Sequence, residues 1–150
     1  MSTEAPTLAR PEEAAAITAL LTAQLEEHAI PLAPELLAER VRSALADDQQ
    51  AVILLARRGG RAVGVAYLSF GFILERGGLA MFLEELYVVP ELRGQGTGTS
   101  LLRAALDVAR ARGCRTAELE VESSHARAAN LYARAGFRPL PRVHYMLPLG

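Results

Sequence analysis

A glycine-rich run in the middle of the chain has the residue types that bind phosphate. The run reads Arg93-Gly94-Gln95-Gly96-Thr97-Gly98, between an apolar stretch and a segment of helical spacing. Glycines let successive backbone N–H groups turn toward one point, and a helix N-terminus adds partial positive charge, so an anionic phosphate fits there. A Walker loop is excluded because the chain has no Lys, and G-x-G-x-x-G fails because its last position is Thr99 or Leu101. A turn that only joins strand to helix remains the alternative.

Two adjacent acids interrupt the apolar stretch before this run. Strand alternation places them on opposite faces with different neighbours: Phe82, Leu86 and Val88 for Glu84, and Met81, Leu83 and Tyr87 for Glu85. An unpaired carboxylate buried there is costly. If the acid lines a hydrated cleft, desolvation raises its pKa toward that of a useful base. The other interpretation is that one or both acids point to solvent or pair with an Arg.

Helices and a meander of strands precede these residues. A first helix begins at Pro11 and ends near His28, and a second runs from Pro34 to Leu45. Two apolar runs on either side of the Gly59-Gly60 turn predict a β-hairpin, and a third run follows the Gly77-Gly78 turn. The three expected strands are Ala51–Arg57, Arg61–Phe72 and Ala80–Val89.

Helical spacing resumes at Thr97 and ends at Gly113, and a strand, Arg115–Val121, follows. That strand joins its predecessor through a helix, so the two should be parallel. A last helix ends at Gly136, and a final strand covers Val143–Leu149. We therefore expect an α/β fold with a mixed sheet in one domain, residues 1–150.

Composition excludes several classes of protein. The 150 residues include 16 basic and 17 acidic ones, for a net charge of -1, unlike a sequence-independent nucleic-acid binder. The single Cys114 cannot form an internal disulfide or a structural zinc site, which favours a reducing compartment. No apolar stretch approaches the roughly 18 residues of a membrane span, and residues 1–6 lack a signal peptide's basic region. We expect a cytoplasmic protein with no metal, nucleic-acid or membrane partner.

Three segments together resemble the GNAT superfamily of N-acetyltransferases. Arg93-x-x-Gly96-x-Gly98 is similar to the family's R/Q-x-x-G-x-G/A pyrophosphate motif, Leu83–Pro90 to its fourth strand, and Leu131–Phe137 to its "lY..lGF" segment. Within the family, residues 83–88 look closest to the polyamine and thialysine acetyltransferase branch. The resemblance implies a single-domain, mixed but mostly antiparallel sheet flanked by about four helices. Its central parallel strands would be splayed by a bulge around the coenzyme cleft.

The resemblance also implies acetyl-CoA as co-substrate, with its pyrophosphate on the glycine-rich loop and its pantetheine arm beside the fourth strand. His125 stands where the family often has Asn, and either replaces it or caps the last helix. A homodimer is implied as well. The residues assigned to the coenzyme are Leu86, Tyr87, Val88, Val89, Arg93, Gly94, Gln95, Gly96, Thr97, Gly98, Thr99 and His125.

Acetyl transfer to an amine needs a neutral amine, a stabilised oxyanion and a proton for the departing thiolate. By the resemblance, Glu84 matches the base, with Glu85 as second candidate, and a backbone N–H near Val88 serves the oxyanion. Tyr132 matches the proton donor, although its helix stripe alone predicts a core residue. A row of acids either attracts a cationic acceptor or forms a solvated strand face: Glu118, Glu120 and Glu122.

The function expected from these residues is acetyl transfer from acetyl-CoA to a primary amine of a small molecule, such as a polyamine or an amino acid. Two alternatives stay open. One is acetylation of protein N-termini or lysines, and the other is a non-catalytic acyl-CoA sensor, against which Glu84 and Tyr132 argue. The acceptor does not follow from fold and coenzyme.

Overall fold

The computed structural model describes residues 2–122 and 124–150. The chain divides into two compact units, Met1–Glu120 and Val121–Gly150. The first unit contains every strand and three of the four helices found in the described residues.

A five-stranded sheet in the order β1-β2-β3-β4-β5 forms the centre of the first unit. Pairs from β1 to β4 are antiparallel, whereas β4 and β5 are parallel because α3 carries the chain back between them. The predicted mixed sheet is thus confirmed. The strands are β1 (Thr7–Leu8), β2 (Ala51–Arg58), β3 (Arg61–Ile73), β4 (Gly78–Val88) and β5 (Thr116–Leu119).

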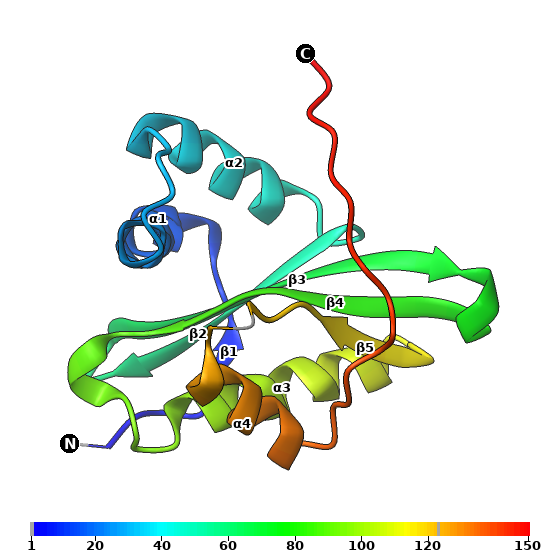
Figure 1. The fold of residues 1–150 in the computed structure, drawn as a ribbon. Helices are drawn as coiled ribbons and strands as arrows, with labels where there is room; N and C mark the ends of the chain where they lie inside the picture. The colour runs from blue at the N-terminus through cyan, green and yellow to red at the C-terminus, as the bar shows by residue number, and fades with distance from the viewer. Residues whose placement is uncertain (1, 123) are drawn as a thin grey trace. The chain divides into compact units, whose positions relative to one another are not determined.

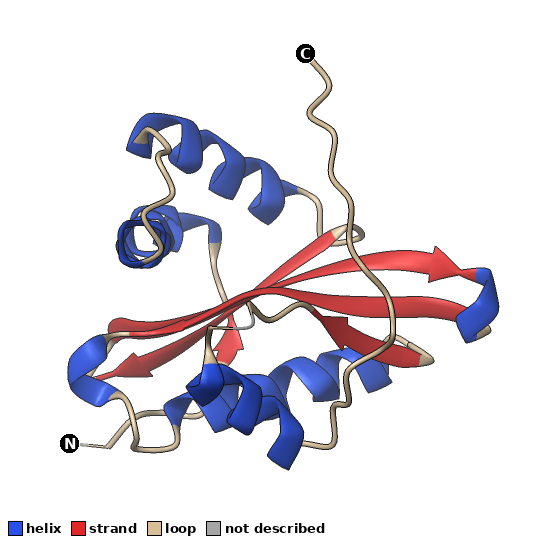
Figure 2. Ribbon diagram, viewed as in Figure 1, coloured by secondary structure: helices blue, strands red, loops and turns tan. Residues whose placement is uncertain are grey.

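Helices cover both faces of this sheet. In Figures 1 and 2, α1 (Ala14–Glu27) and α2 (Pro34–Ala46) lie over one face, and α3 (Thr97–Ala111) lies against the other. Because β2 is covered on both faces, its residues 51–57 are all buried, as its continuous apolar run predicts. Among the helices that the structure describes, none has the length and apolarity to cross a membrane.

The core is closely packed between the sheet and its helices. A Cβ at Gly64 of β3 would lie 2.9 Å from Leu101 Cδ1 of α3 and 3.3 Å from the Tyr87 carbonyl oxygen, so the close approach of α3 requires glycine there. Each large side chain removed from water contributes about 1.5–3 kcal/mol. The largest fully buried side chains are Ile17, Leu55, Leu68, Met81, Leu101, Leu102 and Val65.

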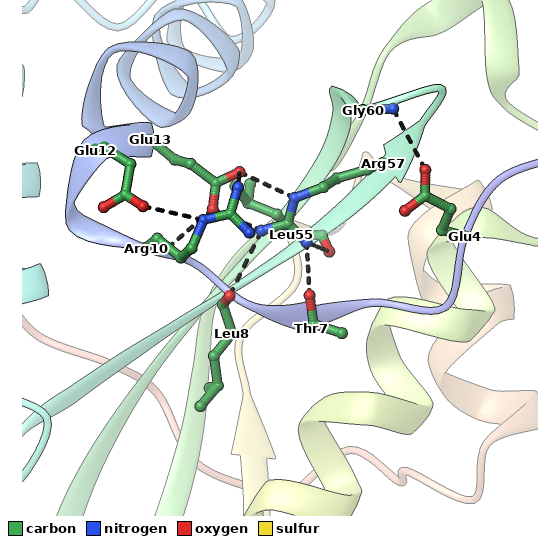
Figure 3. A network of polar contacts seen from close by, with 9 residues as sticks. All are labelled: Glu4, Thr7, Leu8, Arg10, Glu12, Glu13, Leu55, Arg57 and Gly60. Atoms are coloured by element: carbon green, nitrogen blue, oxygen red, sulfur yellow. Dashed lines mark hydrogen bonds and ion pairs between the residues drawn. The ribbon is translucent and has the colours of Figure 1, made fainter.

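A buried arginine fastens the N-terminal segment to the sheet (Figure 3). Arg57 of β2 is 7% exposed and donates Nε and Nη2 to the Glu13 carboxylate at 2.9 and 2.6 Å. Its Nη1 donates to Thr7 Oγ1 at 2.6 Å, and the Arg10 backbone N–H also donates to Glu13, at 2.9 Å. Hydrogen bonding to Arg57 lowers the pKa of Glu13 to about 2. The start of α1 is therefore held against β1 and β2.

In the described part of the second unit, one helix is found, α4 (Ala126–Arg134). The predicted final strand, Val143–Leu149, is wrong: residues 137–150 form neither helix nor strand. A strand needs a neighbouring ladder, and no other strand occurs in this unit among its described residues. Prolines at 139, 141 and 148 remove further N–H donors. The segment's large apolar side chains are exposed: Leu140, Val143, Tyr145, Met146, Leu147 and Leu149.

Candidate active site

A β-bulge interrupts β4 at the two candidate acids. Register with β3 changes from Leu68↔Leu83 to Tyr67↔Glu85, so Glu84 is the extra residue. Directly opposite residues share a face, which places Glu85 with Tyr67, on the side opposite to Leu83. The predicted grouping of Glu85 with Met81 and Leu83 is therefore wrong, because the bulge reverses the alternation beyond it.

The ladder between β4 and β5 ends at the same point. Pairing runs from Ala80↔Thr116 to Leu83↔Leu119, whereas β4 continues to Val88. From Glu84 onward, β5 therefore provides no ladder partner for that edge of β4, among the residues described. Backbone N–H and C=O groups on such an edge are suited to pair with an extended ligand. The predicted parallel pairing of the two strands is confirmed, and their splaying around a coenzyme cleft stays a prediction.

The two acids at the bulge have different surroundings. Glu84 is exposed, and its Oε1 accepts a hydrogen bond of 2.6 Å from Ser69 Oγ. Glu85 is half-buried; desolvation raises its pKa, the nearby charge of Glu84 raises it further, and a hydrogen bond from Gln24 lowers it. The environment of Glu85 therefore favours its acting as a base.

Glu85 also lines a cavity of about 1020 Å³ between the sheet and the helices α1 and α2. The charged residues of the lining are Glu39, Arg40, Asp47 and Glu85. Apolar side chains from α1, α2 and the segment between them form much of the rest: Leu21, Leu25, Ile30, Leu32, Leu37, Val41 and Ala44. The cavity thus combines apolar walls with three acids and one arginine.

The glycine-rich run forms the predicted turn between strand and helix. Gly94 and Gly96 have φ values of 78° and 89°, and α3 begins at Thr97 with Gly96 as its N-cap and no side-chain cap. The first N–H groups of a helix have no partner inside the helix and carry partial positive charge. A Cβ at Gly96 would meet no atom within 4 Å, so the space beside the turn is open. The loop fits a phosphate group of a coenzyme.

Arg93, the first residue of this motif, is hydrogen-bonded within the protein. Its Nε donates to the Val88 carbonyl at 2.9 Å and its Nη2 to the Glu27 carboxylate at 2.7 Å. The guanidinium lies 5.3 Å from the centre of the Tyr87 ring. Hydrogen bonding to Arg93 lowers the pKa of Glu27. The side chain of Arg93 thus connects the loop to β4 and to the end of α1.

Sequence reasoning missed Glu27 as a residue of this region. A carboxylate in the last turn of a helix opposes the helix dipole, so it calls for a compensating cation. The position of Glu27 at the end of a helix therefore predicted a cationic partner. Which residue is that partner, here Arg93, depends on the tertiary fold. Glu27 also accepts a hydrogen bond from Tyr87, whose pKa is raised by burial and then by this bond.

The other coenzyme candidates of the first unit follow β4 and the turn. Tyr87, Val88 and Val89 are buried, and Leu86 is half-buried. The Val89 N–H donates to the Val63 carbonyl at 3.0 Å. In the turn and first helical residues, Gln95 is exposed, Thr97 is buried, and Gly98 and Thr99 are half-buried. The first unit therefore brings Glu84, Glu85 and residues 86–99 together on the bulge and the loop that follows.

The remaining predicted residues have other surroundings. Tyr132 is half-buried in the second unit, with its ring edge-to-face on Phe137 at 5.9 Å between centroids. His125 is the N-cap residue of α4, but its side chain makes no capping hydrogen bond. In the predicted row of acids, Glu118 accepts hydrogen bonds from Thr116 Oγ1 at 2.7 Å and Arg76 Nε at 3.2 Å.

The mixed sheet, the bulge in β4 and the glycine-rich turn before α3 together match the arrangement that the sequence resemblance predicts, and the comparison with known families agrees. The chain belongs to the Acetyltransferase (GNAT) family, whose model matches residues 15–137.

Named relatives and a solved structure extend this result. The chain is 35% identical to the aminoglycoside N(6′)-acetyltransferase type 1 of Klebsiella aerogenes over 62% of each protein. It is 38% identical to the thialysine N-epsilon-acetyltransferase of Mus musculus over 42% of this chain and 37% of that one. The matched part thus spans less than two thirds of both relatives. The aminoglycoside N-acetyltransferase AAC(6′)-Iy in complex with CoA shares the fold, with a TM-score of 0.84 and 17% identity over 98% of this chain and 95% of that one.

Proposed function

We propose that this protein transfers the acetyl group of acetyl-CoA to a primary amine of a small molecule. The observation that carries the proposal is the position of Glu85 at the bulge. There the edge of β4 leaves β5, and the same residue lines the cavity under α1 and α2. A base in that position serves a coenzyme on one side and an amine on the other.

The coenzyme would be held by backbone groups of this chain. N–H groups of residues 94–99 suit its pyrophosphate, and the edge of β4 over residues 84–88 suits its extended amide-containing arm. Acetyl-CoA, when bound, supplies the activated acetyl thioester. A β4 backbone N–H near Val88 is our candidate donor to the oxyanion that develops at the acetyl carbonyl.

Glu85 is our first choice for the base, ahead of Glu84. An alkylammonium has a pKa of roughly 10.4, so most of the acceptor arrives protonated at neutral pH. The carboxylate must be ionised to accept that proton, and a raised pKa makes the transfer more favourable. Burial raises the pKa of Glu85, whereas Glu84 is exposed and hydrogen-bonded to Ser69. This order reverses the one that the family resemblance suggests.

Tyr132 stays our candidate for the proton that the coenzyme thiolate receives, on the strength of its position in the Leu131–Phe137 segment. A phenol with a pKa of about 10 is well matched to a thiolate leaving group. Tyr132→Phe keeps the ring and its contact with Phe137. If Tyr132 is the donor, turnover falls by roughly 10²-fold or more with little change in coenzyme affinity. Near-normal turnover would remove Tyr132 from the mechanism.

The cavity supports a small cationic acceptor. Three of its four charged lining residues are acids, which favours an ammonium-bearing molecule over an anion. The aminoglycoside N(6′)-acetyltransferase and thialysine N-epsilon-acetyltransferase relatives are named for small amine substrates. A protein N-terminus or lysine is the alternative acceptor.

A homodimer and a cytoplasmic location complete the proposal. Exposed apolar side chains between residues 140 and 149 support an association, because large apolar groups exposed together often mark an interface. The single thiol, Cys114, supports a reducing compartment. Light scattering of the purified protein tests the proposed homodimer. A monomer at micromolar concentration would contradict it.

Release of CoA thiol in a panel of acceptors tests the main proposal. We expect turnover with polyamines, aminoglycosides or amino acids, and loss of most turnover in Glu85→Gln with less loss in Glu84→Gln. Turnover only with peptides would favour the protein acetyltransferase alternative. Coenzyme binding without turnover in any panel would favour the acyl-CoA sensor.

A substitution in α3 tests the coenzyme loop separately. Gly96 has a left-handed φ, so any side chain there adds strain and confuses the result. Gly98 lies inside α3 and outside the positive-φ set. Gly98→Asp places a negative charge on the helix N-terminus, which suits the helix but repels pyrophosphate. We expect its affinity for acetyl-CoA to fall at least tenfold, about 1.4 kcal/mol, while the matched Gly98→Ala retains binding. Equal affinities would count against this loop.

A further inference from the structure

The side chain of Gln24 connects α1 to the bulge in β4. Its Nε2 donates to the Leu86 carbonyl oxygen at 3.4 Å, across 62 positions of sequence, and the side chain also hydrogen-bonds to the Glu85 carboxylate. A carboxamide has two N–H donors on one nitrogen, so it can serve both acceptors at once. Gln24 and Glu85 both line the cavity under α1 and α2.

We propose that Gln24 is a positioning residue for acetyl transfer, holding the carboxylate of Glu85 in its ionised form and aimed at the acceptor amine. This proposal rests on the role proposed above for Glu85 as the base. Gln24 itself neither accepts nor donates a proton in the reaction. It acts on the base through its hydrogen bond and on the adjacent backbone through Leu86.

The hydrogen bond from Gln24 to Leu86 restrains the backbone of β4 next to Glu85. Leu86 directly follows Glu85, and the bulge has removed one regular pairing position just before it. A bulged strand is free to bend locally unless another element fixes it. The hydrogen bond from Gln24 fixes the carbonyl group of Leu86, the residue that follows the base. The same side chain therefore restrains both the carboxylate of Glu85 and the adjacent backbone of β4.

The hydrogen bond from Gln24 affects the ionisation of Glu85 because several other groups around Glu85 also influence its pKa. Glu84 lies next to it on β4, and Tyr67 faces it from β3. The other charged lining residues are Glu39 and Arg40 of α2 and Asp47, which follows α2. Burial and the charge of Glu84 raise the pKa of Glu85, and the hydrogen bond from Gln24 lowers it. The pKa of Tyr67 is itself raised, by burial first and then by the two acids, so the neutral phenol persists at neutral pH. Gln24 therefore offsets part of the tendency of Glu85 to take up a proton.

The test is the pH dependence of kcat at saturating substrates in Gln24→Met, which keeps the side chain's length and removes both donors. On the acidic limb of the plot of kcat against pH, the rate falls because Glu85 becomes protonated. Loss of a hydrogen-bond donor to the carboxylate raises the pKa of Glu85 and therefore moves this acidic limb to higher pH. We expect a shift of about one pH unit, equal to a tenfold change in protonation. Well above that limb, kcat should recover to within about threefold of the wild type.

Thr18→Val is the matched control on the same helix. Thr18 Oγ1 donates to the Ala14 carbonyl at 2.8 Å, within α1, and Thr18 does not line the cavity. Its acidic limb should stay where it is in the wild type. An equal shift in both variants would show that any disturbance of α1 has this effect, and would overturn the specific role of Gln24.

Two further measurements separate the inference from the proposed function. If Glu85→Gln keeps its turnover and its acidic limb, Glu85 is not the base and both ideas fail. If Glu85→Gln loses the limb but Gln24→Met leaves it in place, only the role of Gln24 fails. Carboxyl ¹³C NMR titration of Glu85 in the wild type and in Gln24→Asn, whose shorter amide reaches less far, gives the same shift without relying on activity or on the folding of the Met variant. An unchanged titration there would overturn the proposal.

Discussion

Helix α1 is fastened near both ends by an arginine–glutamate pair, and the two pairs differ in burial rather than in distance. Before its first residue, Arg57 Nη2 lies 2.6 Å from Glu13, with side chains 9% and 13% exposed. At its last residue, Arg93 Nη2 lies 2.7 Å from Glu27, with side chains 31% and 41% exposed. Nearly equal distances therefore describe two different interactions.

Burial decides what each pair contributes. Removing one partner of a buried pair leaves an uncompensated charge in the protein interior and costs about 3–5 kcal/mol, whereas exposed pairs are worth about 0–1 kcal/mol. The first pair also includes hydrogen bonds to Thr7 and to backbone carbonyls. We infer that the start of α1 is a structural anchor, while its end, beside the glycine-rich loop, is held weakly enough to adjust.

The largest effect is expected from Arg57→Met, which leaves Glu13 with only the exposed Arg10 guanidinium, whose Nη2 lies 3.6 Å away. We expect the free energy of unfolding to fall by about 3–5 kcal/mol in urea denaturation. Arg58→Met, one residue further along β2, is the control and should cost less than about 1 kcal/mol. Similar losses of unfolding free energy in both variants would mean that the buried hydrogen bonds of Arg57 do not add to the stability of the fold.

Acid should weaken the same anchor. The pKa of Glu13 is lowered from 4.5 to about 2, so between these values the unfolded chain binds a proton that the folded one does not. The stabilisation is complete above about pH 4.5 and disappears as pH falls toward about 2, a loss of about 3 kcal/mol. Unfolding of the wild type and of Glu13→Gln at several pH values measures it. A difference between them that stays constant down to pH 2 would contradict the assignment.

The smallest effect is expected at the other end of α1. Glu27→Gln should change the free energy of unfolding by less than about 1 kcal/mol, because the pair is partly hydrated. Its effect should vanish in about 1 M salt, where the screening length is roughly 3 Å. The effect of Glu13→Gln should persist in the same salt. If salt removes both effects alike, burial is not what distinguishes the two pairs.

Local pattern was sufficient for much of the fold. The change of period at Thr97 predicted the first residue of α3 correctly, because glycines before it and an amphipathic stripe after it are both local signals. The hairpin between β2 and β3 follows in the same way from Gly59 and Gly60. Each of these signals lies within a few residues of the feature that it predicts.

The features that were missed depend on a partner distant in sequence. The family resemblance implied a bulge, but its position at Glu84 is defined only by the register with β3, so alternation within β4 gave the wrong face for Glu85. The predicted strand Val143–Leu149 has the right residue types but forms no ladder in the described structure. The buried Arg57 depends on Glu13 in the same way. Of the site, the glycine turn and the acids were found from sequence, whereas the roles of His125 and Tyr132 stay predictions.

Glu13 and Arg57 are 44 positions apart in the chain, and this separation bears on how long the folded protein lasts. Bringing them together closes a long loop, whose entropy is lost before the contact contributes. We therefore expect the pair to form after the main folding barrier is crossed. Its removal would then leave the refolding rate nearly unchanged and speed unfolding about a hundredfold for a loss of about 3 kcal/mol, as stopped-flow kinetics can measure. On this view the buried arginine sets the lifetime of the native state, and the local hairpins and helices set the speed of reaching it.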